Sequence, residues 1–268
     1  MVSFEFFRNG LRILSNVHPE QTKTNQLTLF SFHGNSSCAE TFSEIIKTAP
    51  FQVIACDLPG CGKSMRLAEY SMDVIAGLMA ELVKSFRINA NKIVLFGHSL
   101  GGHLVSQISA KLDDKIAGIA IAGTPALSSA ADFALAFDPT EENKKLVPML
   151  MMERSFTHQE AELFVGHTGV EGDLLELMVA HACGTDGKFR SGCLGTLADF
   201  DQKSHLQGMK NVIIFHAIFD GVINPDYLEQ INKNCLFEDK IHYLECRHMS
   251  PIEKASEIVD VVVRCFGM

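Results

Sequence analysis

One stretch of ten residues constrains the fold of this 268-residue chain more than any other. Residues 93–102 read Ile-Val-Leu-Phe-Gly-His-Ser-Leu-Gly-Gly, and an amphipathic stretch follows them directly. The apolar start is typical of a buried strand, and Gly-x-Ser-x-Gly is typical of a tight turn between a strand and a helix. Such a turn strains the backbone of its central residue and holds that side chain clear of both elements. The stretch therefore predicts a strand, a turn that presents the Ser99 hydroxyl, and a helix.

The predicted place of Ser99 suits catalysis. The start of the following helix offers free backbone N–H groups, which favour a developing negative charge. Open α/β folds bind ligands at the carboxyl ends of their strands, where this turn would lie. We therefore interpret Ser99 as a candidate nucleophile. The alternative is an ordinary turn, because glycine and serine are common in turns.

Strand and helix patterns alternate on both sides of this stretch. Apolar runs predict further strands at 27–32, 51–55, 116–122, 211–220 and 240–246, and the stretch 71–86 has the spacing of a helix with one buried face. The alternation predicts an α/β fold, with a mostly parallel central sheet and helices on both faces. Residues 4–17 read instead as an antiparallel pair around Asn9-Gly10, a dipeptide typical of a type I′ turn, and we place this pair at one edge of the sheet. Helix starts are predicted by Ser37-x-x-Glu40, Thr157-x-x-Glu160 and Ser250-Pro251-x-Glu253.

The alternation stops between about residues 125 and 205, where the patterns indicate helices only. A helical insertion after a central strand is typical of a lid over the strand ends. The predicted organisation is therefore a core domain made of 1–124 and 206–268, with a helical cap, 125–205, inserted in it.

Composition excludes several classes of partner. The formal net charge is −9 and the pI about 5.6, so no basic patch indicates nucleic acid or an anionic membrane. No apolar run reaches the length of a membrane span, and residues 1–5 lack the features of a signal peptide. We expect a cytoplasmic protein whose partner is a small molecule.

Local metal and cofactor motifs are absent from the sequence. The eight cysteines form no Cys-x-x-Cys pair, and the eleven histidines form no His-x-His or His-Glu-x-x-His. We therefore expect reduced cysteines, no metal and no cofactor. Gly60-x-Gly62-Lys63-Ser64 resembles the end of a phosphate-binding loop, but that loop needs four residues between its glycines. We interpret the segment as a turn.

Catalysis by Ser99 requires a base, an acid that orients the base, and N–H donors for the oxyanion. His248 lies between the last predicted strand and helix, and Asp220 ends the preceding strand, both at the edge predicted for Ser99. The backbone N–H groups of Asn35 and Leu100 are the candidate oxyanion donors. These five residues form the predicted catalytic machinery.

Other polar residues compete for these roles. Asp132 and Asp138 follow the strand after Ser99 and stay open as alternative acids, whereas Asp57 follows an earlier strand and is expected to stabilise its turn. Among the histidines, His98 and His103 flank Ser99 and are expected to be structural. We expect His33 to orient the loop beside the substrate.

The order of these residues resembles the α/β-hydrolase fold over essentially the whole chain. The resemblance is closer to the AidH-type N-acyl-homoserine lactonases, and it rests on His33-Gly34-Asn35-Ser36-Ser37, Asp57-Leu58-Pro59-Gly60, Ser99-Leu100-Gly101-Gly102-His103 and Gly123-Thr124-Pro125. It implies a metal-independent serine hydrolase that opens lactones or esters through an acyl-enzyme, and it makes residues 125–205 the family's cap.

Three positions depart from that subgroup. Asp220 stands where the subgroup has glutamate, Phe164 where it has tyrosine, and Arg247 where many hydrolases of the fold have glycine. The resemblance implies that Phe164 and His33 contact the substrate, and the change at 164 bears on which substrate is used. A general carboxylesterase, a C–C bond hydrolase and a small-ligand receptor with little turnover stay open as alternatives.

Overall fold

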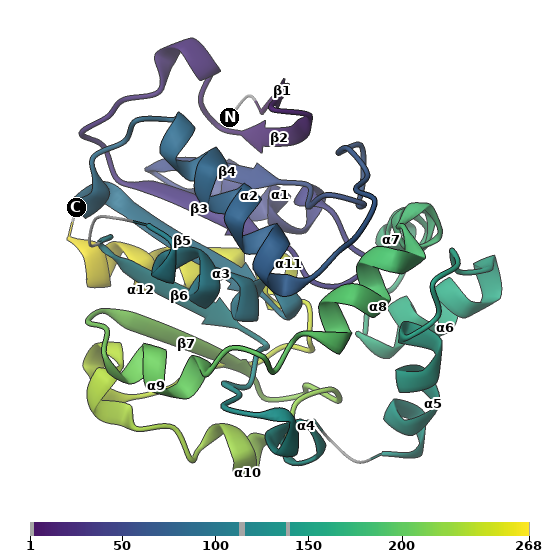
Figure 1. Ribbon diagram of the computed structural model, residues 1–268. Coiled ribbons are helices and arrows are strands. Elements are labelled where there is room, and N and C mark those ends of the chain that lie inside the picture. The colour runs from purple at the N-terminus through teal and green to yellow at the C-terminus, as the bar shows by residue number, and fades with distance from the viewer. Residues whose placement is uncertain (1–2, 113–115, 138–139, 268) are drawn as a thin grey trace.

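The computed structural model describes residues 3–112, 116–137 and 140–267, and its centre is one sheet of eight strands (Figure 1). The strand order is β1-β2-β4-β3-β5-β6-β7-β8. The strands are β1 Phe4–Arg8, β2 Leu11–Ser15, β3 Thr28–Phe32, β4 Gln52–Cys56, β5 Ile93–His98, β6 Gly118–Ala122, β7 Val212–Ala217 and β8 His242–Leu244. Strands β3 to β8 pair in parallel, whereas β2 pairs antiparallel with both β1 and β4. The predicted α/β class with a mostly parallel sheet is confirmed.

The N-terminal hairpin lies at the sheet edge, as predicted. Its two turn residues, Asn9 and Gly10, have φ angles of 52° and 77°. Positive φ at both central positions is what a type I′ turn requires, and its twist matches that of the flanking strands. The hairpin thereby adds an antiparallel edge to the parallel sheet.

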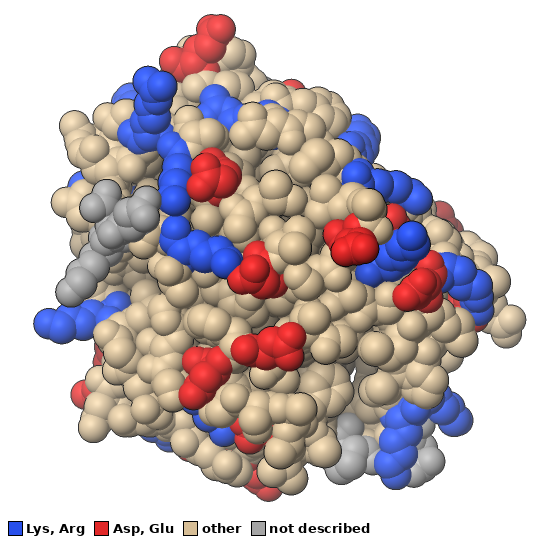
Figure 2. Space-filling model, in the orientation of Figure 1, with Lys and Arg blue, Asp and Glu red and all other residues tan. Residues whose placement is uncertain are grey.

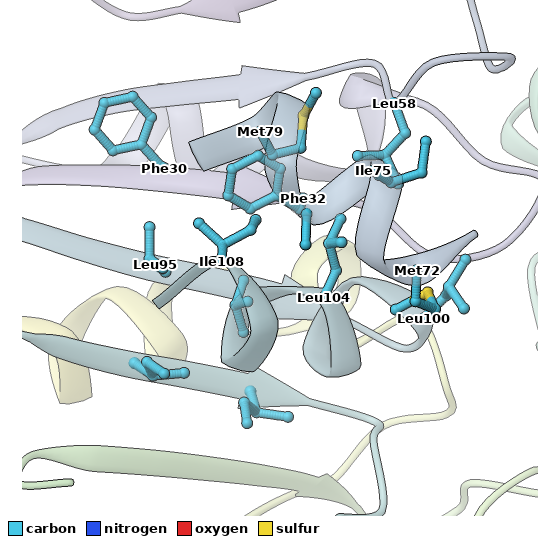
Figure 3. Packing of buried hydrophobic residues seen from close by; sticks show 14 of the residues in the cluster. Phe30, Phe32, Leu58, Met72, Ile75, Met79, Leu95, Leu100, Leu104 and Ile108 are labelled. Carbon is cyan, nitrogen blue, oxygen red and sulfur yellow. The ribbon is translucent and has the colours of Figure 1, made fainter. Parts of the chain in front are cut away.

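Helices cover both faces of the sheet (Figure 1). One face carries α1 Ser43–Thr48 and α12 Ala255–Phe266, and the other carries α2 Met72–Ser85 and α3 Leu100–Ala110. Figure 3 shows how α2 and α3 close the second face: Met79 and Ile75 of α2 and Leu104 and Ile108 of α3 lie against Phe32 of β3. Two apolar layers therefore hold the sheet rigid beneath the loops at its carboxyl edge.

The described part of residues 125–205 contains helices and no strand. They are α4 Ala130–Ala136, α5 Glu141–Leu150, α6 His158–His167, α7 Asp173–Gly184, α8 Gly187–Gly195 and α9 Gln202–Gln207. Helix α9 packs on α3, where Gln202 Nε2 donates to the carbonyl of Gly102 at 3.0 Å. Helices α5 to α7 contribute most of a separate hydrophobic cluster and lie beyond the ends of the parallel strands (Figure 1). The division into a core and a 125–205 cap stays a prediction.

Of the three segments that predicted helix starts, one forms the expected capping box and two do not. Thr157 and Glu160 cap α6 reciprocally. Ser37 instead bonds Thr41, because Glu40 is drawn away to Arg12, and the chain forms a short 3₁₀ turn, Ala39–Phe42, before α1. Ser250 is the first residue of α11 Ser250–Glu253, whose N-cap is Met249, so the proline fits but the serine does not cap.

A buried arginine joins the hairpin to the rest of the sheet. Arg12 of β2 is 3% exposed, and its guanidinium donates to Glu5, Glu40 and Asp57 over 2.6–3.4 Å. Burial raises the pKa of Glu40, but the hydrogen bonds and charge of Arg12 outweigh it and lower the pKa to about 2. The three carboxylates therefore hold the arginine at a position that periodicity alone would assign to an apolar residue.

We expect Arg12→Met to lower the free energy of unfolding by about 3 kcal/mol at pH 7, because the side chain of Asp57, 0% exposed, would lose its cation. Glu40 has a lowered pKa in the folded state, so its contribution is complete above its ordinary pKa of 4.5 and is lost as the pH falls toward about 2. The gap between wild type and variant should therefore narrow below pH 4.5. Urea unfolding at pH 7 and pH 3 measures it, and a gap that widens in acid would contradict this account.

The surface mixes charges of both signs. Figure 2 shows lysine and arginine interspersed with aspartate and glutamate on the face drawn, with no area of one sign dominating it. Within the described residues, no helix is long and apolar enough to cross a membrane.

Candidate active site

Ser99 occupies a strained turn between β5 and α3. Its φ and ψ are 53° and −120°, a conformation that costs a non-glycine residue of order 1–3 kcal/mol. The backbone is fixed on both sides, because the Ser99 N–H donates to Ala122 at 2.9 Å and Thr124 Oγ1 donates to the Ser99 carbonyl at 2.7 Å. A Cβ at Gly97 would lie 2.1 Å from the carbonyl oxygen of Gly101, so the turn tolerates no side chain there. The predicted strand, tight turn and helix are present.

His248 and Asp220 meet at the same edge of the sheet. The Nδ1 of His248 lies 2.8 Å from Oδ2 of Asp220, and their side chains are 6% and 0% exposed. Asp220 Oδ1 accepts from the backbone N–H of Val222 at 2.8 Å. Strand β7 ends at Ala217, so Asp220 lies in the turn three residues beyond the strand rather than at its end. Two sequence-distant candidates are thus paired.

The pair is arranged to keep the carboxylate ionised. Burial raises the pKa of Asp220, but the charge and hydrogen bond of His248 and the N–H of Val222 outweigh it and leave the pKa below its ordinary value. An ionised Asp220 accepts a hydrogen bond from the Nδ1–H of His248, which leaves Nε2 of the imidazole free to take a proton.

His98 holds the base from a second side. Its Nε2 lies 2.8 Å from the backbone carbonyl of His248, and the two rings are 4.9 Å apart. Burial lowers the pKa of His98 to about 3, so the ring is neutral and donates from Nε2. His98 therefore positions His248, in keeping with the structural role expected for it.

The candidate oxyanion donors lie beside Ser99. Leu100 is the first residue of α3, where backbone N–H groups have no acceptor within the helix. Asn35 follows Gly34, and a Cβ at Gly34 would lie 3.0 Å from Cβ of Ser99, so this loop passes very close to the candidate nucleophile. Asn35, Ser99 and Leu100 all line one pocket.

The expected contact of His33 with substrate is not supported by its position. His33 is 0% exposed and does not belong to the described residues that line the pocket. Its Nδ1–H donates to Gly34 at 2.8 Å, while Nε2 accepts from the N–H of Leu58 at 2.9 Å, so both ring nitrogens are used. His33 orients the loop that carries Asn35, and its assignment as a substrate-binding residue is corrected accordingly.

The pocket is apolar around the reacting edge. Phe164 of α6 lines it, as expected, and packs against Phe156 with ring centres 5.8 Å apart. Most of the other large apolar residues come from α4 to α8 and the segments that join or follow them: Phe133, Phe137, Leu146, Val147, Leu150, Val165, Met178, Leu194 and Leu197. A hydrocarbon chain fits such a lining.

Two polar pocket residues escaped the sequence analysis. Asn143 of α5 and His167 of α6 both line the pocket, and His167 Nε2 lies 2.7 Å from Asn143 Oδ1. They are 24 positions apart on different helices, so no local spacing indicates the pair. Each is a polar residue in an amphipathic helix, and the sequence does not show which face of that helix the pocket will meet. Only the tertiary structure therefore identifies the pair.

A second hollow reaches the candidate base. It lies between α5, α6 and the turn after β7, and its lining includes Phe219, Arg247 and His248. Arg247 donates to the carbonyl of Gly169 at 2.9 Å and to Glu171 at 2.7 Å. The arginine therefore connects the segment beside His248 to the loop between α6 and α7.

Two of the competing acids, Asp57 and Asp132, are engaged elsewhere. Asp57 accepts from the N–H groups of Ala39 and Lys63 at 2.7 and 2.9 Å, in the turn role predicted for it. Asp132 accepts from the N–H of Ser128 at 2.7 Å at the start of α4. Asp138 lies outside the described residues. His103 pairs with Gln202 of α9 at 2.8 Å, and burial lowers the pKa of His103 to about 4.

Comparison with known proteins agrees with this fold. Residues 28–255 match the family model described as the alpha/beta hydrolase fold. Among solved structures, N-acyl homoserine lactonase AidH complexed with N-butanoyl homoserine is similar over 100% of this chain and 98% of its own, at 21% identity and a TM-score of 0.81. A putative aryl esterase from Burkholderia cenocepacia has 16% identity, full coverage of both chains and a TM-score of 0.74. An esterase from Exiguobacterium antarcticum has 15% identity, 97% coverage of both and a TM-score of 0.75. No curated protein matches the sequence.

Proposed function

The chain belongs to the α/β-hydrolase fold family, and from that premise we propose that it is a serine hydrolase of carboxylic esters and lactones, with N-acyl-homoserine lactones as its substrates. One observation carries the proposal. The hydrogen-bonded pair of Asp220 and His248 reaches the pocket that Ser99 lines, and that pocket is otherwise largely apolar. A nucleophile, an oriented base and an acyl-binding space are the parts that ester hydrolysis needs.

The proposed reaction has two halves. His248 takes the proton of the Ser99 hydroxyl as the serine oxygen attacks the carbonyl, and the backbone N–H groups of Asn35 and Leu100 stabilise the oxyanion. Collapse breaks the ester bond, His248 returns the proton to the leaving oxygen, and an acyl-enzyme results. Water, deprotonated by His248, then releases the acid and regenerates Ser99.

The proposed substrate follows from the lining together with the likeness to AidH. An N-acyl-homoserine lactone has a hydrocarbon tail, an amide and a lactone ring. The apolar residues of α5 to α8 suit the tail. In this proposal the 125–205 segment is the cap that encloses the tail. A carboxylesterase is the second candidate, because the same apolar lining suits a simple acyl or aryl ester.

We expect purified protein to open N-acyl-homoserine lactones and to keep that activity in EDTA, because every proposed step uses side chains and backbone N–H groups. The product is the ring-opened N-acyl-homoserine, whose lactone re-forms on acidification. Mass spectrometry before and after acidification, with and without EDTA, measures this.

Four other results would each redirect the assignment. Free homoserine lactone and a fatty acid would indicate amide cleavage. Turnover of p-nitrophenyl esters alone would favour the esterase, and cleavage of ring-cleavage dienones a C–C hydrolase. Saturable binding without turnover would indicate a receptor.

Phe164→Tyr, which restores the hydroxyl expected in the lactonase subgroup, should lower KM for the lactone but not for a p-nitrophenyl ester.

A further inference from the structure

Three metal-binding side chains meet away from the pocket. Cys38, Glu40 and His181 each direct one ligand atom, and these atoms lie within 4.8 Å of one another. Cys38 and Glu40 follow the loop that carries Asn35, whereas His181 belongs to α7. None of the three is among the described residues that line the pocket of Ser99. The cluster therefore connects two distant parts of the chain and is separate from the candidate catalytic residues.

Apolar packing surrounds the three metal-binding side chains. Cys38 is 0% exposed and packs in the same hydrophobic cluster as Met178 and Val179 of α7. Helix α7 is thus held against the loop by apolar contacts on the residues next to His181. The donor atoms meet because the packing brings them together rather than because flexible surface side chains happen to be near.

Glu40 is oriented by a partner of its own. Arg12 donates to its two carboxylate oxygens at 2.6 and 2.9 Å. A carboxylate has about four lone-pair positions, so it accepts from an arginine and still coordinates a metal. Arg12 also contacts Glu5 and Asp57, so its charge stays balanced when Glu40 shares its own charge with an ion. The arginine fixes the carboxylate in the way that outer partners fix metal ligands.

We propose that Cys38, Glu40 and His181 bind one Zn²⁺ ion, which ties α7 to the loop that carries Asn35. Thiolate sulfur, imidazole nitrogen and carboxylate oxygen together are a zinc donor set, whereas Ca²⁺ and Mg²⁺ take oxygen ligands. Zinc bonds of about 2.0–2.3 Å place tetrahedral ligands about 3.5 Å apart, so any pair of donor atoms that is further apart than this closes inward on binding. Water completes the fourth position.

Binding releases a proton. The thiol of Cys38 becomes a thiolate when its sulfur coordinates zinc, because the thiolate is the form that binds metal. The ion therefore replaces the thiol proton, and no oxidation or other bond cleavage is involved. The ion takes no part in the proposed hydrolysis, so EDTA removes it without removing the activity.

The test uses the full chain after treatment with a chelator. Zn²⁺ titrated against a chromophoric chelator is expected to bind at one site per chain, with proton release in weak buffer. At zinc 100-fold above Kd, the Tm should rise by about 5 °C. His181→Ala and Cys38→Ser should each weaken zinc binding at least about tenfold and remove the rise in Tm. Mg²⁺ and Ca²⁺ should change neither quantity.

A matched control lies on the same helix. Cys183 is two residues from His181 and is not one of the three proposed zinc ligands, so Cys183→Ser should bind zinc like wild type. Ser99→Ala should also keep the zinc site, which separates this proposal from the proposed hydrolase. Equal zinc affinity in wild type and in folded His181→Ala, or no zinc binding by wild type, would overturn the site. His181 is partly exposed, so its variant is expected to fold even where Cys38→Ser does not.

Discussion

Replacement of Ser99 by alanine is expected to lower kcat by a factor on the order of 10⁴ or more, with little change in Tm. The physical reason is that the hydroxyl is the proposed nucleophile and no other group at the turn can form the acyl-enzyme. Hydrolysis of a p-nitrophenyl ester and of an N-acyl-homoserine lactone should fall together. A fluorophosphonate should label wild type at Ser99 and leave the variant unlabelled.

Ser109 gives a matched control for this variant. It lies on the same helix α3, and its hydroxyl donates to the carbonyl of Ser106 at 2.8 Å. Ser109→Ala should keep wild-type kcat and wild-type labelling. If Ser99→Ala retained activity, or if the probe labelled another serine, the proposed nucleophile would be wrong.

Replacement of Asp220 by asparagine is expected to lower kcat about 10⁴-fold near neutral pH while the protein stays folded. An amide at this position can donate to Nδ1 of His248 and so favour the tautomer whose Nε2 carries the proton. That tautomer cannot accept the serine proton. The comparison is kcat against pH for both proteins, with the melting temperature as a check on folding.

Asp132→Asn is the matched substitution at a competing acid. Asp132 lies at the start of α4, with Lys203 3.7 Å from its carboxylate, and is not bonded to His248 in the described structure. Loss of the Asp132 carboxylate should lower the free energy of unfolding by about 1 kcal/mol, the value of an interaction at a helix end, and should leave kcat unchanged. If Asp132→Asn lost activity and Asp220→Asn kept it, Asp132 rather than Asp220 would be the acid that orients His248.

Local sequence predicted the features that depend on local physics. The strained turn at Ser99 follows from glycines whose missing side chains permit close backbone contact, and the hairpin follows from a dipeptide that tolerates positive φ. The parallel sheet follows from alternation. The carboxyl ends of parallel strands lie at one edge of a sheet, and Ser99, Asp220 and His248 each follow such a strand. This rule was the reason for expecting the three residues, which are distant in sequence, at the same edge.

The features that the sequence did not predict depend on pairing across the chain. Arg12 is polar in a buried strand because three acidic residues surround it, and none of these is its neighbour in sequence. The same arginine takes Glu40 away from a helix cap that the local pattern favoured. For His33 we expected the loop-orienting role, whereas the substrate contact implied by the resemblance does not fit a ring whose two nitrogens bond Gly34 and Leu58. Cys38 and His181 are 143 positions apart, beyond any motif.

The second hollow at His248 is relevant to a competition between two reactions of the proposed acyl-enzyme, hydrolysis and re-formation of the lactone. When a lactone opens on Ser99, its new hydroxyl remains attached to the acyl group and competes with water for the same carbonyl. Return of that hydroxyl re-forms substrate, so net turnover depends on how quickly water arrives. The hollow lined by Phe219, Arg247 and His248 adjoins the acyl pocket, and the two share His248. Water that approached His248 through this hollow would commit the acyl-enzyme to release while the tail still occupied the acyl pocket.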